Sequence, residues 1–137
     1  MKVMVLGKAT AQSEAGEFGT PEDFVAMDQY NEKLAEAGIV LAGGGLQPTS
    51  KGKRVAIDAD GNATVIDGPF AETKELIAGY AIWEVASMDE AVEWVKRSPF
   101  RDGEVELRKV LDTEDFADSF PAEIAAAEER AGLAAKQ

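Results

Sequence analysis

The sequence predicts an α+β fold in which two helices cover one face of a single sheet. Apolar segments of strand length, two amphipathic stretches with capping residues, and one strong hairpin signal are the observations behind this prediction. Their order is strand, helix, strand, hairpin, strand, helix, strand, followed by a helical tail. This order is that of a ferredoxin-like βαββαβ arrangement with an inserted β-hairpin.

Length and composition limit the class of protein. A chain of 137 residues is most simply one domain, and no apolar run approaches the roughly 18 residues of a membrane helix. The apolar run near the N-terminus is too short for a signal peptide, so we expect a cytoplasmic protein without a membrane partner. The net charge of −12 opposes the phosphate backbone of nucleic acids, which we therefore exclude as partners.

The sequence contains neither cysteine nor histidine. Thiolate nucleophiles, cysteine metal sites, the commonest general base and the commonest metal ligand are therefore all missing. We expect no metal site and no cofactor.

The first half of the domain contains two predicted strands around one helix. Residues 2–8 are apolar on both faces of a strand, residues 9–19 are predicted as a loop, and residues 39–42 form the second strand. Between them, Thr20 caps a helix that ends at Gly38. Its predicted apolar stripe consists of Phe24, Met27, Tyr30, Leu34 and Ala37.

Three glycines, at positions 43–45, follow the second strand. A phosphate-binding loop does not fit, because Gln47 stands where the first glycine of that motif is required. We expect a strand bend here, where backbones or a ligand approach closely.

The second half starts with a hairpin, Arg54–Asp58 and Ala63–Asp67, around the turn signal Asp60-Gly61. It leads into a forced turn, in which Gly68 supplies conformational freedom and Pro69 stops the ladder. A long strand over residues 76–86, a helix opened by Ser87, and a strand over residues 104–111 complete the domain. Residues 112–137 are acidic and alanine-rich, with a helix over 121–135, and are predicted as an extension of the 1–111 domain and not a second domain.

The strands are apolar on both faces, although the two helices can cover only one. A second subunit is the commonest cover for the other face, so the pattern predicts a twofold homodimer with a cavity between the two sheets.

One motif points to a family. The run from Asp67 to Glu75 reads DGPFAETKE, and together with Gly79-Tyr80 it resembles the DGPF-type branch of the YCII-related proteins. The resemblance extends over residues 1–111 and implies a dimeric α+β barrel. Some members are encoded near or fused to extracytoplasmic-function sigma factors, which implies a signalling role. A His and Asp pair is proposed to act in the wider family, but only Asp67 can correspond to it here.

The candidate catalytic residue is Asp67, which could act as acid or base if burial raises its pKa. The alternative is that its carboxylate accepts hydrogen bonds from turn amides. The candidate ligand-binding residues are Arg54, Phe70, Glu72, Lys74 and Tyr80, with Gly68 and Pro69 as structural turn residues. The alternatives are a surface ion pair for the arginine, a solvated loop for Glu72 and Lys74, and an interface aromatic for the tyrosine.

Three functions are compatible with these residues. The first is a dimer that binds a small molecule or a protein partner in or near an inter-subunit cavity. The second is a cofactor-independent lyase or isomerase that uses Asp67 as base, with Arg54 or Lys74 holding the substrate. The third is an accessory protein in sigma-factor-linked signalling whose acidic tail, residues 112–137, docks on a basic partner.

Overall fold

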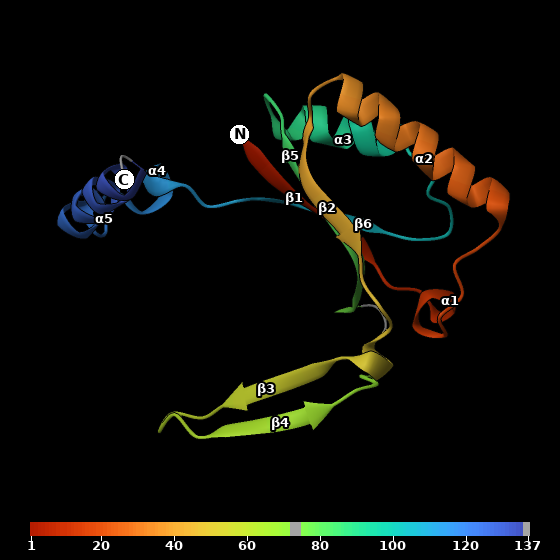
Figure 1. Cartoon of the computed structure of the whole chain (residues 1–137), viewed down its shortest axis with the longest axis horizontal. Coiled ribbons are helices and arrows are strands. Elements are labelled where there is room, and N and C mark those ends of the chain that lie inside the picture. The colour runs from red at the N-terminus through yellow and green to blue at the C-terminus, as the bar shows by residue number, and fades with distance from the viewer. Residues whose placement is uncertain (72–74, 136–137) are drawn as a thin grey trace.

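The computed structural model describes residues 1–71 and 75–135. The elements of the domain are β1 (Lys2–Lys8), α1 (Ala11–Glu14), α2 (Pro21–Glu36), β2 (Val40–Gly45), the 3₁₀ turn η1 (Thr49–Lys51), β3 (Lys53–Ile57), β4 (Ala63–Asp67), β5 (Ile77–Glu84), α3 (Met88–Lys96) and β6 (Val105–Lys109). The extension contains α4 (Thr113–Phe116) and α5 (Pro121–Ala135). Figure 1 shows the chain from end to end.

The sheet confirms the predicted ferredoxin-like topology. Its strand order is β2-β5-β1-β6, and every neighbouring pair is antiparallel. The two central strands, β1 and β5, are not consecutive in the sequence, which is the mark of the split βαβ arrangement. The β3–β4 hairpin forms a separate two-stranded sheet, inserted between β2 and β5 as predicted.

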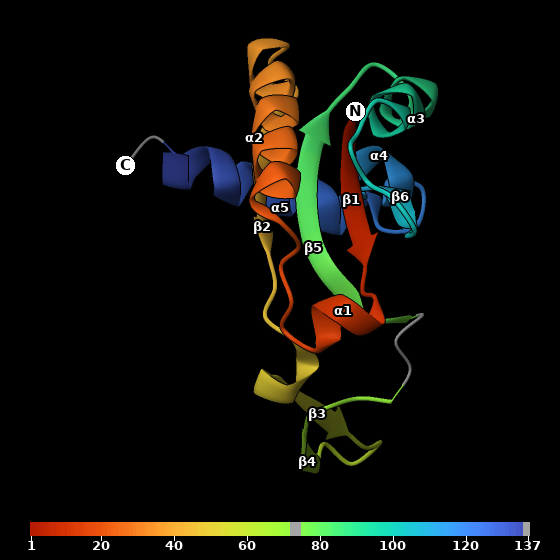
Figure 2. The ribbon, with the colours of Figure 1, turned by 90° about the vertical axis from the view of Figure 1, so that its right-hand side faces the viewer.

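The core lies between the sheet and the two long helices. Val3, Val5 and Trp83 point from the sheet to Leu34 of α2 and Ala91 of α3, and all five are less than a tenth exposed. Figure 2 shows both helices on the same side of the sheet. Burying apolar surface contributes about 25 cal/mol per Å², so these side chains stabilise the packing of both helices on the sheet.

Capping residues set the helix starts that the sequence predicts. Thr20 and Asp23 exchange side-chain and backbone hydrogen bonds at the start of α2, and Gly38 follows its end with a φ of 70°. Ser87 accepts the N–H of Glu90 at the start of α3, whereas the Glu90 carboxylate accepts the N–H of Ala86. These local bonds satisfy N–H groups that the helices themselves leave free.

Three local predictions were incomplete. The predicted loop 9–19 contains the short helix α1, capped by Thr10, and the tail contains a further short helix, α4. The triple glycine belongs to β2, so that strand extends to Gly45. Two members of the predicted stripe of α2 do not join it: the side chain of Phe24 is 73% exposed, and Ala37 is an exposed residue that follows the end of the helix.

The other face of the sheet has no helix on it among the described residues. The β3–β4 hairpin and the α4–α5 extension both project on this side, as the two views show (Figures 1 and 2). Met4, Leu6 and Ile82 are half-buried on this face, and Tyr80 is 38% exposed. We call this side the open face.

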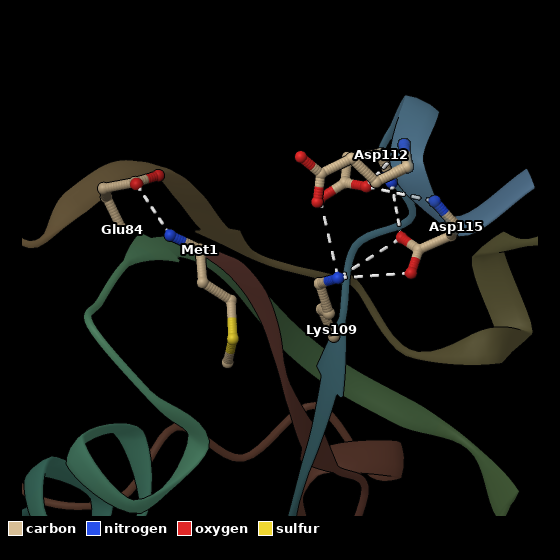
Figure 3. A network of polar contacts seen from close by, with 6 residues as sticks. Met1, Glu84, Lys109, Asp112 and Asp115 are labelled. Atoms are coloured by element: carbon tan, nitrogen blue, oxygen red, sulfur yellow. Dashed lines mark hydrogen bonds and ion pairs between the residues drawn. The ribbon is translucent and has the colours of Figure 1, made fainter. Parts of the chain in front are cut away.

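Charged contacts tie the extension to the end of the sheet (Figure 3). Lys109, the last residue of β6, contacts Asp115 at 3.2 Å and Asp112 at 3.5 Å. The hydrogen bond to Asp115 is the main reason why the pKa of Lys109 lies above its ordinary value. On the neighbouring strands, the N-terminal ammonium of Met1 pairs with Glu84 at 2.9 Å. Among the described residues, the ion pairs that the extension makes with the sheet come from Asp112 and Asp115 at its start, and most described side chains of α5 are exposed.

Candidate functional site

A cavity of about 590 Å³ lies between α2 and the sheet. Met27, Asn31 and Ala35 line it from α2, and Phe100 and Arg101 line it from the segment that joins α3 to β6. Figure 2 shows β1 and β5 between α2 and α3 on this side of the sheet, with α1 across the lower end of β5. Ligand sites commonly have volumes of roughly 300–1,000 Å³ with mostly apolar walls and few polar groups, which describes this cavity.

The sheet side of the cavity is built largely of glycine. Gly7 of β1 pairs with Gly79 of β5, and Gly79 pairs in turn with Gly45 of β2. All three line the cavity. They lie on the helix-covered face, because residues two apart on a strand share a face and Val5 belongs to the core. We call these three residues the glycine floor.

Tyr30 closes the inner end of the cavity beside the core. Its hydroxyl donates a hydrogen bond of 2.6 Å to the carbonyl oxygen of Trp94. Burial raises the pKa of Tyr30 to about 12, and nearby Arg97 opposes this effect. The hydroxyl therefore joins α2 to α3. The other polar or charged residues that line the cavity are Lys8, Thr10, Asn31, Tyr80, Arg101 and Glu104.

Replacing Tyr30 by phenylalanine is expected to lower the free energy of unfolding by about 1 kcal/mol at neutral pH, the usual contribution of one hydrogen bond. The folded state favours the neutral phenol, whereas the unfolded chain ionises near pH 10, so Tyr30 loses its stabilising effect as the pH rises from 10 toward 12. Urea unfolding of wild type and Tyr30→Phe at pH 7 and pH 11 measures both effects. Tyr80→Phe is the control. If the free energy of unfolding falls equally between pH 7 and pH 11 in Tyr30→Phe and in the wild type, Tyr30 is not the source of this pH dependence.

The predicted catalytic residue lies outside this cavity. Asp67 is the last residue of β4, opposite Lys53 of β3, and its carboxylate forms an ion pair with the Lys53 ammonium. The two side chains are 75% and 66% exposed, and neither residue is among those that line the cavity. An acid or base role for Asp67 therefore stays a prediction.

The turn after Asp67 is bonded to a distant part of the chain. The backbone N–H and the hydroxyl of Thr49 donate to the two carboxylate oxygens of Glu14, and the same hydroxyl accepts the N–H of Phe70 at 3.1 Å. Gly68 donates its N–H to the carbonyl of Gly52, also at 3.1 Å. We call these five residues the neck, because they join the hairpin to α1 and η1.

Glycine is required at position 68 for a reason that sequence reasoning did not identify. Its φ is not in the left-handed region, where the glycines are Gly16, Gly19, Gly38 and Gly61 among the described residues. A Cβ on Gly68 would instead overlap the backbone carbonyl of Thr49. The cause is a close approach of two backbones. The next peptide bond, Gly68–Pro69, is cis.

The structure brings two of the predicted ligand-binding residues together. The guanidinium of Arg54 lies over the ring of Phe70, 3.9 Å from its centre. Tyr80 is separate from them: its ring lies beside Gly44 on the open face, and the residue is also among those that line the cavity. Glu72 and Lys74 fall outside the described residues, so their predicted roles stay predictions.

The residues that build the neck and the glycine floor could not be identified from the sequence. Glu14 and Thr49 are 35 positions apart, and the glycine floor is drawn from three strands. The glycines are visible in the sequence, but only the strand register shows that three of them lie side by side. No local pattern marks Glu14 as the partner of Thr49.

Within residues 1–71 and 75–135, no three His, Cys, Asp or Glu side chains gather closely enough to hold a metal ion. In the same part of the chain, no helix has the length and apolar character needed to cross a membrane.

Comparison with known proteins identifies the family. The model of the YCII-related domain matches residues 1–114. The chain belongs to the YCII-related family. This membership agrees with the resemblance of the Asp67 to Glu75 run, whereas assignment to the DGPF-type branch stays a prediction.

Two individual proteins are similar to this YCII-related chain. An uncharacterized protein of Rhizobium meliloti (strain 1021) is 39% identical over 70 residues, which are 51% of this chain and 56% of that protein. The chain thus spans about half the length of the curated relative it matches. A solved structure of 5-chloro-2-hydroxyhydroquinone dehydrochlorinase from Burkholderia phenoliruptrix, in complex with 2,5-dihydroxybenzoquinone, is 19% identical, with a TM-score of 0.44. That alignment covers 83% of this chain and 98% of the dehydrochlorinase.

Proposed function

We propose that this YCII-related protein binds a small, largely apolar molecule in the cavity between α2 and the sheet. The observation that carries the proposal is the cavity itself, about 590 Å³ with mostly apolar walls and a glycine floor. The cavity opens to solvent, because wall residues such as Asn31, Phe100 and Arg101 are exposed, and concave, mostly apolar clefts of this size are where proteins commonly bind small molecules. Polar residues in its walls, Asn31, Arg101 and Glu104 among them, supply groups that orient a ligand.

The proposed site differs in place from the predicted cavity between two subunits. It lies on the helix-covered face of one chain, while the predicted inter-subunit space lies on the open face. The proposal therefore keeps the predicted small-molecule ligand and moves it to the other side of the sheet. Asp67 belongs to neither wall of the cavity, and no observation favours a lyase or isomerase reaction there.

Filling the cavity from α2 tests the proposal. Ala35 lines the cavity, whereas Glu32 lies on the same helix and does not. We expect the neutral dye Nile red to bind the wild type and Glu32→Trp equally, and Ala35→Trp at least about tenfold more weakly, because the indole occupies the ligand volume. Fluorescence titration measures the three affinities. Equal binding by all three proteins would refute the cavity as the site.

We also propose that the open face pairs with the same face of a second copy. A single chain leaves Met4, Leu6 and Ile82 only half-buried there, next to the ring of Tyr80. Apolar sheet faces of this kind are normally covered, and an isologous twofold pair is the commonest cover. The hairpin and the α4–α5 extension project on the same side, so they would flank the second copy (Figure 1).

The extension, residues 112–137, was predicted to dock on a protein partner. Most described side chains of α5 are exposed, and residues 112–137 carry a net negative charge. Docking of residues 112–137 on a basic partner, and a role in sigma-factor-linked signalling, stay predictions that a pull-down with and without these residues can test. The boundary of the domain at residue 111 is likewise a proposal.

A further inference from the structure

The glycine floor is a strip of bare backbone. Gly7, Gly79 and Gly45 lie at the same level on three adjacent strands, and strands in a sheet are roughly 4.8 Å apart. The strip therefore extends for roughly 10 Å across the sheet without a side chain on the cavity side. Elsewhere on the same face, core side chains such as Val5 and Trp83 rise from the sheet toward α2.

The fold itself does not require these glycines. None of the three has a left-handed φ. A Cβ on Gly45 would meet nothing within 4 Å, and the nearest atoms to a Cβ on Gly7 or Gly79 would be at 3.7 Å and 3.4 Å, which are ordinary contacts. Gly43 is different, because its Cβ would lie 3.1 Å from the carbonyl oxygen of Tyr80.

Glycine within a strand carries a cost. It loses more conformational freedom on folding than any other residue, so a glycine that neither φ nor packing requires lowers stability. Three such residues side by side, all facing one cavity, indicate that the cavity needs a flat surface. The strip thus has a functional explanation where a structural one is missing.

We infer that the glycine floor selects planar ligands, so that the natural ligand of the cavity is a flat, largely apolar ring compound that lies on the peptide groups of β1, β5 and β2. The inference rests on the proposed function. A flat ring can contact a flat floor over its whole face, and contacts of this kind are individually small but add up. Met27 and Phe100 line the cavity as well, and a thioether and an aromatic ring are suited to cover the other face of such a ligand.

Two neutral alcohols with the same number of carbon atoms test the inference. 2-Naphthol is planar and 1-adamantanol is a compact cage, so they differ mainly in shape. We expect titration calorimetry with the wild type to show binding of 2-naphthol at least about tenfold tighter than binding of 1-adamantanol. The variants Gly45→Ala and Gly79→Ala should remove most of this preference, because a methyl group lifts a flat ring from the floor.

Stability separates this role from a structural one. Gly45→Ala and Gly79→Ala should shift the midpoint of urea unfolding to the same or a higher urea concentration while they weaken 2-naphthol binding. Gly132→Ala, at an open position in α5, is the control and should leave both affinities unchanged. A lower urea midpoint in both floor variants would show that the fold needs these glycines and would overturn the inference.

The remaining outcomes distinguish the two proposals. If both alcohols bind the wild type equally and Ala35→Trp blocks both, the cavity is a ligand site without shape selection, and only the inference fails. If Nile red binds and neither alcohol does, the inference alone fails. If none of the three compounds binds, the proposed function fails and the inference with it.

Discussion

Replacing Gly68 by alanine is expected to lower the free energy of unfolding by about 3 kcal/mol or more, the upper part of the range for overpacked sites. The new Cβ overlaps the carbonyl of Thr49, and the carbonyl carbon behind it would be only 2.6 Å away. Both are backbone atoms, so a side-chain rotation cannot relieve the clash. The carbonyl of Gly52, at 3.3 Å, limits movement in another direction.

Relief of this clash has to disturb the neck. Moving Thr49 weakens its bonds to the Glu14 carboxylate and to the N–H of Phe70, and moving Gly68 breaks its bond to Gly52. We therefore expect amide hydrogen exchange to accelerate at Phe70 and Gly68, in addition to the change seen by urea unfolding. The hairpin beyond the neck should lose protection with them, because an isolated two-stranded hairpin is marginally stable in water.

Gly61→Ala provides the matched comparison. Gly61 has a φ of 86° and open space around its Cβ, so its replacement costs only the conformational penalty of about 1–2 kcal/mol. If Gly68→Ala is no more destabilising than Gly61→Ala, the close approach of Thr49 does not hold in solution.

Replacing Ile82 by aspartate is expected to convert a dimer into a monomer. Ile82 lies on the central strand β5, opposite Met4 of β1 on the open face. An unpaired carboxylate within an apolar interface costs several kcal/mol, which corresponds to a dissociation constant raised at least about a hundredfold. Light scattering at micromolar concentration should change from about twice the monomer mass of 14.6 kDa to that mass.

Val25→Asp is the control for this experiment. Val25 is an apolar residue of α2 that is 52% exposed on the helix side, so the same type of substitution there should leave the dimer intact. Circular dichroism establishes that both variants are folded. A wild type that is already monomeric, or a dimer that survives Ile82→Asp, would exclude the open face as the interface.

The order and type of the elements could be predicted because their signals are local. Thr20 with Asp23, Gly38, Ser87 and Asp60-Gly61 mark helix ends and a hairpin through bonds or dihedral angles confined to a few residues. The two short helices were missed, since a four-residue helix has too few positions to show a period. Phe24 was misassigned because periodicity shows which residues share a helix face, but not how far the sheet extends beneath that face.

The candidate site was only partly predictable. The run from Asp67 to Glu75 identifies the family, and the structure places its described part in a neck that supports the hairpin. The cavity was not predicted, since its walls come from α2, all four strands of the sheet and the segment before β6. A sequence motif shows which residues are characteristic of a family. It does not show whether those residues bind a ligand or allow two backbone segments to pack together.

The amino-acid sequence by itself determined the element order, the helix caps, the apolar character of both sheet faces and the absence of histidine and cysteine chemistry. These depend on residue type and short-range spacing. The tertiary structure alone decided that Gly7, Gly79 and Gly45 form one floor and that Gly68 lies against Thr49. Strand register and the approach of distant backbones set these contacts, because they follow from how the whole chain packs.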